Sequence, residues 1–129
     1  MATLISDNVV RKLWLKAQRK NTDEWASVAL WNYIYNKHLF PGTGWVVTPE
    51  YPPSSGRRRV DITIRYITQQ NTLATLAFPE AKDHAASPGQ ITDAESQALD
   101  ACTAYLSMEG NEGLNLVYAI TSYGTKAEV

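Results

Sequence analysis

The sequence predicts an α/β fold in which a mixed β-sheet is flanked by helices. Two helical patterns come first in the chain, and three segments with strand patterns follow them. A further helical pattern separates the third strand segment from a fourth, and a helix is the usual connection between parallel strands. The 129 residues have the length of one ordinary domain, and no internal repeat divides them. We therefore expect residues 1–129 to form a single domain.

The helical segments are marked by apolar spacing and by capping residues. They are expected at residues 7–20, 21–38 and 92–106. In the first, Asp7 can act as N-cap, and lysines and arginines form the face opposite the apolar side chains. In the second, Glu24 lies three residues after Asn21, as in a capping box. Thr92 and Glu95 have the same spacing at the start of the third helix.

Two of the expected strands contain charged residues among their apolar residues. Strands are expected at residues 45–50, 60–66, 73–82 and 114–123. In residues 60–66 every second residue is apolar, and Asp61 points to the other face. Residues 73–82 are apolar on both faces at first, as in a central strand, and end with Glu80 and Lys82. Burying charge costs several kcal/mol unless it is compensated, so these residues require an explanation.

Composition and charge limit the class of protein. No apolar run approaches the roughly 18 residues that span a bilayer, so we expect no membrane association. The single cysteine, Cys102, permits no internal disulfide, and the start of the chain does not resemble a signal peptide. We therefore expect an intracellular protein, in the nucleus or the cytoplasm. The tryptophans at positions 14, 25, 31 and 45 are expected in the core rather than in a base-stacking platform.

The charge is distributed unevenly along the chain. The net charge is −1, but residues 1–66 carry ten Lys and Arg against five Asp and Glu. Residues 67–129 carry two against eight. A pI of about 6.1 argues against strong non-specific binding of nucleic acid. The first half nevertheless has the charge for a local basic surface.

Three charged residues are expected to meet at one point of the sheet. A hairpin would bring Asp61 beside Glu80 on the next strand, with Lys82 on the same face. Adjacent carboxylates repel each other, and a hard divalent cation such as Mg²⁺ relieves the repulsion because it takes oxygen ligands. The lysine would then orient or deprotonate a water, or neutralise charge that develops on a phosphate.

In these residues and in the order of its elements, the chain resembles the PD-(D/E)XK nuclease superfamily. The resemblance covers about residues 22–123, with Asp61 at the second motif and Glu80 and Lys82 at the third. It implies a restriction-endonuclease-like core of helix, three strands, helix and strand, preceded by an extra N-terminal helix. It also implies a nuclease that depends on Mg²⁺ or Mn²⁺ and acts on DNA, with RNA as the second candidate. Nuclease-like domains of fungi are similar in the segments RRRVDI, EAK, ESQALDACTAYL and VYAITSYGTKA.

The resemblance also assigns expected roles to other residues. The metal ligands would be Asp61, Glu80, the carbonyl of Ala81 and Glu24. Gln97 would be the catalytic helix residue that follows the third motif. The contacts to nucleic acid would come from Arg57, Arg58, Arg59 and His84. Cutting both strands of a duplex needs two sites and therefore a homodimer, whereas a monomer would nick or act on single strands.

Each of these residues also has an ordinary structural explanation. Asp61 and Glu80 could be solvated strand-end charges, Glu24 a capping residue and Gln97 a surface residue. An inactive nuclease-like module that binds nucleic acid or protein is therefore the alternative function.

Two positions depart from the family pattern. Val60 stands where the family has a proline before the aspartate. Pro79 precedes Glu80, where it would remove a hydrogen-bond donor from a central strand.

Overall fold

The computed structural model describes residues 6–19, 24–51, 60–83, 85–108 and 116–129. The helices are α1 (Asn8–Ala17), α2 (Glu24–Ile34), the π-helical turn η2 (Tyr35–Leu39) and α3 (Pro88–Leu106). The strands are β1 (Trp45–Tyr51), β2 (Val60–Ile67), β3 (Leu73–Lys82), β4 (Tyr118–Tyr123) and β5 (Lys126–Glu128). The predicted nucleic-acid contacts Arg57, Arg58, Arg59 and His84, and the predicted cap Asn21, lie outside the described residues.

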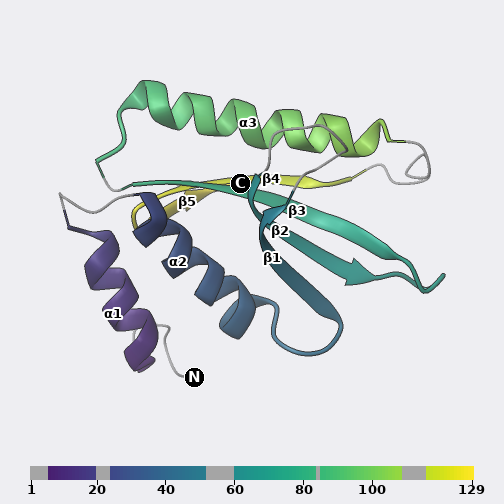
Figure 1. Ribbon diagram of the computed structural model, residues 1–129, viewed down its shortest axis with the longest axis horizontal. Coiled ribbons are helices and arrows are strands. Elements are labelled where there is room, and N and C mark those ends of the chain that lie inside the picture. Colours follow the sequence, from purple (N-terminus) through teal and green to yellow (C-terminus); the bar gives the residue numbers. More distant parts are fainter. Residues whose placement is uncertain (1–5, 20–23, 52–59, 84, 109–115) are drawn as a thin grey trace.

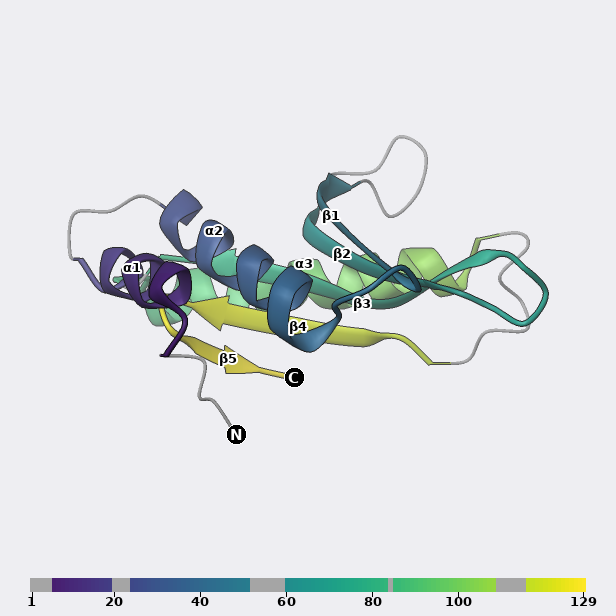
Figure 2. The ribbon, with the colours of Figure 1, turned by 90° about the horizontal axis from the view of Figure 1, so that it is seen from below.

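The five strands form one mixed sheet in the order β1-β2-β3-β4-β5. β3 and β4 are parallel, and the other neighbouring strands are antiparallel. α3 connects β3 to β4 and covers one face of the sheet, whereas α1 and α2 lie on the opposite face (Figures 1 and 2). The α/β class with a mixed sheet is confirmed. β5 was not predicted, because three residues are too short to show a period.

Each face of β3 contributes to a separate part of the core. On the α3 face, Phe78 packs with Ala101, Cys102 and Tyr105. On the α2 face, the core contains Tyr35, Ile62, Ile64 and Ala77. A strand with helices on both faces has apolar residues of both parities, as the sequence indicated for residues 73–82.

α1 is attached to α2, and α2 to the sheet. Asp7 caps α1 as predicted, because its side chain accepts the N–H groups of Val9 and Val10. The Trp31 indole donates a hydrogen bond of 2.9 Å to the carbonyl oxygen of Gly124, in the turn between β4 and β5. This bond fixes the position of α2 over the sheet. None of the described helices is long and apolar enough to cross a membrane.

The predicted start of α3 was wrong. The helix begins at Pro88, with Ser87 as N-cap. Ser87 accepts the N–H of Gln90, and the Gln90 side chain accepts the N–H of Ser87. This capping box, with proline at the first helical position, satisfies the N-terminal donors earlier in the chain than the Thr92 and Glu95 pattern would. Thr92 and Glu95 therefore lie inside the helix.

The prediction for the tryptophans was wrong at one position. Trp14, Trp31 and Trp45 are partly buried and pack against the core. Trp25 is 52% exposed. Its ring lies at the start of α2, where the Nζ of Lys16 on α1 is 4.1 Å from the ring centroid.

Candidate active site

Asp61 contacts the central strand through its side chain. The paired segment of β2 and β3 runs from Ile64 opposite Ala77 to Ile67 opposite Leu73. Beyond it, Asp61 Oδ2 accepts a hydrogen bond of 2.7 Å from the backbone N–H of Ala81. The carboxylate therefore satisfies a donor of β3, and this bond fixes its orientation.

Pro79 removes no hydrogen bond from the ladder between β3 and β4. Backbone N–H groups alternate in direction along a strand, and the N–H of Ala81 points towards β2. The nitrogen of Pro79, two residues earlier, faces the same side. The parallel register with β4 is continuous from Ala77 to Lys82. The irregularity in the sheet lies elsewhere, at Ile64 of β2 and its neighbour Arg65.

Glu80 is buried against Asp61. It is 3% exposed, and the two carboxyl groups interact directly. Burial, the negative charge of Asp61 and the hydrogen bond between the two side chains raise the pKa of Glu80 to about 8. The Asp61 N–H and the Lys82 ammonium lower this pKa by smaller amounts. Without a cation, Glu80 beside Asp61 therefore binds a proton more readily than an ordinary glutamate does.

Lys82 forms an ion pair with Glu24 across the end of the sheet. Its Nζ lies 3.2 Å from Glu24 Oε1, and the two side chains are 21% and 43% exposed. By strand alternation Lys82 lies on the face of β3 that carries Glu80. The pair brings the first residue of α2 to the end of the central strand, so Glu24 and Lys82 lie in the same region as Asp61 and Glu80.

No three His, Cys, Asp or Glu side chains among the described residues form a group that could hold a metal ion. Asp61 and Glu80 form a pair, and the third acid, Glu24, is paired with Lys82.

Gln97 lies at the edge of the buried stripe of α3 and is partly buried. α3 runs antiparallel to β3, because the Tyr105 hydroxyl accepts the N–H of Thr75 and Ala101 packs on Phe78. The rise is about 1.5 Å per residue in a helix and about 3.3 Å in a strand. Four residues separate Gln97 from Ala101 along α3, which is about the length of two residues of β3. Because Ala101 packs on Phe78, Gln97 lies near the level of Glu80.

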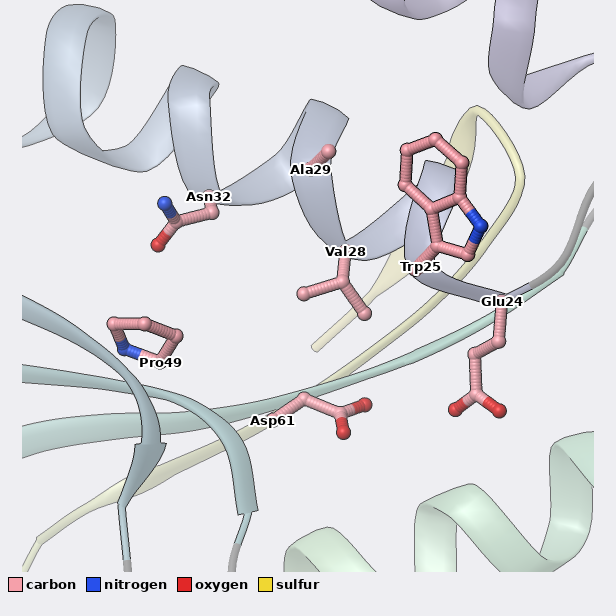
Figure 3. A pocket seen from close by; sticks show the side chains of 7 residues that line it. All are labelled: Glu24, Trp25, Val28, Ala29, Asn32, Pro49 and Asp61. Carbon is pink, nitrogen blue, oxygen red and sulfur yellow. The ribbon is translucent and has the colours of Figure 1, made fainter.

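A groove beside Asp61 was not anticipated from the sequence. It has a volume of about 430 Å³ and runs between α2 and the ends of β1 and β2 (Figure 3). Its lining residues are Glu24, Trp25, Val28, Ala29, Asn32, Pro49 and Asp61. A sequence signal existed, because the α2 lining residues between Trp25 and Asn32 recur at helical spacing, with a polar residue at one end.

Comparison of the chain with models of known protein families found no match, and comparisons with curated proteins and with solved structures found none either.

Proposed function

We propose that this protein is a nuclease that depends on Mg²⁺ or Mn²⁺ and has a restriction-endonuclease-like core. The observation that carries the proposal is the buried pair of Asp61 and Glu80, with Lys82 two residues further along β3. Two carboxyl groups in contact at the end of a central strand destabilise the fold once both are ionised. A function that requires both acids explains why the chain keeps them there.

The donor set fits a hard divalent cation. Carboxylate and carbonyl oxygens are the ligands that such ions prefer, and the positive charge would favour the ionised form of Glu80. Asp61, Glu80 and the carbonyl of Ala81 would hold the ion, and Glu24 would join them if it released Lys82. When bound, the cation supplies charge neutralisation at a phosphate and a lowered pKa for a water molecule.

The remaining groups orient the Asp61 carboxylate and stabilise the charge that develops in the reaction. The Ala81 N–H holds the Asp61 carboxylate in one orientation. The Lys82 ammonium donates hydrogen bonds to a phosphate oxygen or to the attacking water, where it offsets developing charge. Gln97, near the level of Glu80 on α3, has an amide that can hold a water or a phosphate oxygen.

Cleavage and metal binding should be measured together. We expect Mn²⁺ or Mg²⁺ to support cleavage of at least one substrate among single-stranded DNA, duplex DNA and RNA. The same ions should raise the melting temperature, because they bind the folded state. Both effects should be lost in Glu80→Gln.

The matched control is Asp100→Asn, which neutralises an exposed acid on α3 and should preserve both effects. If neither ion raises the melting temperature or supports cleavage, the nuclease proposal is wrong, and the inactive binding module becomes the better explanation.

A further inference from the structure

The groove beside Asp61 combines an aromatic ring with apolar walls. Trp25 is half exposed at its rim, and Val28, Ala29 and Pro49 supply apolar surface. An exposed indole next to apolar side chains is costly in water and suits a flat, partly apolar ligand. In Figure 3, Glu24 and Trp25 lie at one end of this lining, Asn32 and Pro49 lie at the other, and Asp61 lies between the two ends.

Asn32 places a polar group in the same groove. Its amide oxygen is buried and has no hydrogen-bond partner among the described residues. An unsatisfied amide oxygen costs free energy in the empty groove. A ligand with N–H donors at its edge satisfies it after a small rotation of the amide, as the edge of a nucleobase does.

Positive charge lies at the Trp25 end of the groove. Lys16 holds its ammonium over the Trp25 ring at 4.1 Å. The same face of α1 carries further basic residues, Lys12 and Arg19. A phosphate chain that passes this helix therefore meets favourable charge before it reaches Asp61.

We propose that this groove binds an unpaired nucleobase of the substrate strand, stacked on Trp25 and hydrogen-bonded to Asn32. The inference rests on the proposed nuclease function, because Asp61 belongs to both the groove and the acidic pair. A base in the groove is then attached to a nucleotide next to the reacting phosphate. The substrate class is single-stranded nucleic acid, or a strand end with unpaired bases.

The dimensions of the groove favour an unpaired base over a duplex. Its volume of about 430 Å³ is near the lower end of the range in which proteins bind small molecules, about 300–1,000 Å³. A base inside a double helix is stacked on both faces and paired at its edge, so it can enter a groove only after it leaves the stack. Single strands present such bases without that cost.

The test measures binding without cleavage. Fluorescence anisotropy of labelled oligothymidylate, oligouridylate and a blunt DNA duplex should be recorded in EDTA with the wild-type protein. We expect tighter binding of the single strands than of the duplex, and the two oligonucleotides show whether DNA or RNA is preferred. Trp25→Ala should weaken single-strand binding about five- to 150-fold, the range that corresponds to loss of one stacked base.

Matched variants distinguish the loss of base stacking from a general loss of the folded structure. Trp25→Phe keeps an aromatic ring and should retain most of the affinity. Tyr118→Ala removes an exposed aromatic side chain of β4 outside the groove and should leave binding unchanged. Equal binding by Trp25→Ala and wild type, or duplex binding as tight as single-strand binding, would overturn the inference.

The outcomes also distinguish this inference from the nuclease proposal. Binding that depends on Trp25, without any metal-dependent cleavage, supports the groove and rejects the nuclease. Cleavage that depends on Glu80, with binding independent of Trp25, supports the nuclease and rejects the groove.

Discussion

The Ala81 backbone N–H donates a hydrogen bond of 2.7 Å to the Asp61 carboxylate, so an acidic side chain of β2 satisfies a donor of the central strand. Asp61 therefore stabilises the fold as well as forming part of the candidate site. Its negative charge also raises the pKa of Glu80. Substitutions at Asp61 must therefore separate the effect of its hydrogen bond to Ala81 from the effect of its charge on Glu80.

Asp61→Ala and Asp61→Asn should differ in stability. Alanine leaves the N–H of the buried Ala81 without its acceptor, which costs about 1–3 kcal/mol. Asparagine keeps an oxygen acceptor and removes the negative charge beside Glu80. In urea unfolding without divalent cations, we expect Asp61→Asn to be at least as stable as wild type and Asp61→Ala to be less stable. An Asp61→Ala protein as stable as Asp61→Asn would show that the hydrogen bond contributes nothing.

Glu80 should make the cation-free protein less stable as pH rises. Its pKa is about 8 in the folded state against a usual value of 4.5, so the folded state binds one more proton than the unfolded state between these values. Stability falls wherever the folded state binds more protons, so this contribution is lost progressively from about pH 4.5 to about pH 8. The expected total is of the order of a few kcal/mol.

Glu80→Gln is the control for this pH dependence, because it mimics the protonated form and does not titrate. The difference in unfolding free energy between wild type and Glu80→Gln should grow with pH across this range. Saturating Mg²⁺ should reduce the slope for wild type, because the ion favours the carboxylate. A constant difference from acid to neutral pH would mean that Glu80 titrates normally.

Tyr105→Phe tests the contact between α3 and β3. The Tyr105 hydroxyl accepts the N–H of Thr75 at 2.8 Å in a buried position. Phenylalanine preserves the ring that packs on Phe78 but leaves that N–H unsatisfied, so we expect a loss of about 1–3 kcal/mol. The urea midpoint should fall while the slope of the transition stays constant. An unchanged midpoint would contradict this role of the hydroxyl.

Much of the fold could be predicted because its elements carry local patterns. Asp7 marks the start of α1, and the two apolar faces of residues 73–82 indicate a central strand. The start of α3 could not be decided in this way, because Ser87 with Gln90 and Thr92 with Glu95 offer two capping boxes close together. The box with proline at the first helical position forms in the structure.

Only the residues of the candidate site that lie in one hairpin could be predicted to meet, because their spacing in the sequence determines which of them are neighbours. Asp61, Glu80 and Lys82 meet because a turn joins their strands. The pair of Lys82 with Glu24 joins residues far apart in the sequence, and no local pattern indicates it. Trp25 was expected in the core together with the other tryptophans, but α2 is apolar around most of its circumference. Such a helix does not reveal which apolar residue faces solvent.

The arginines before β2 should contribute to binding rather than to chemistry. Neutralising Arg57 or Arg58 to Gln removes one positive charge, so we expect weaker binding. The slope of the logarithm of the binding constant against the logarithm of the salt concentration should become shallower by about one. The rate at saturating substrate should remain close to that of wild type. Lys126→Gln, on β5, is a control that should leave the salt dependence unchanged. Loss of the saturating rate in Arg57→Gln would place this residue in the reaction itself.

Lys82→Ala should reduce turnover by about 10²–10³ with little change in substrate affinity, because the ammonium acts on charge that develops only in the transition state. The substitution should not unfold the protein. Its partner Glu24 is 43% exposed in the wild-type structure, and ion pairs with such an exposed partner contribute about 0–1 kcal/mol. Lys126→Ala, which removes a lysine near the ring of Tyr123, should turn over at the wild-type rate. If Lys82→Ala also cuts at the wild-type rate in Mg²⁺, the spacing of Glu80 and Lys82 has no catalytic meaning, and the binding-module explanation is preferred.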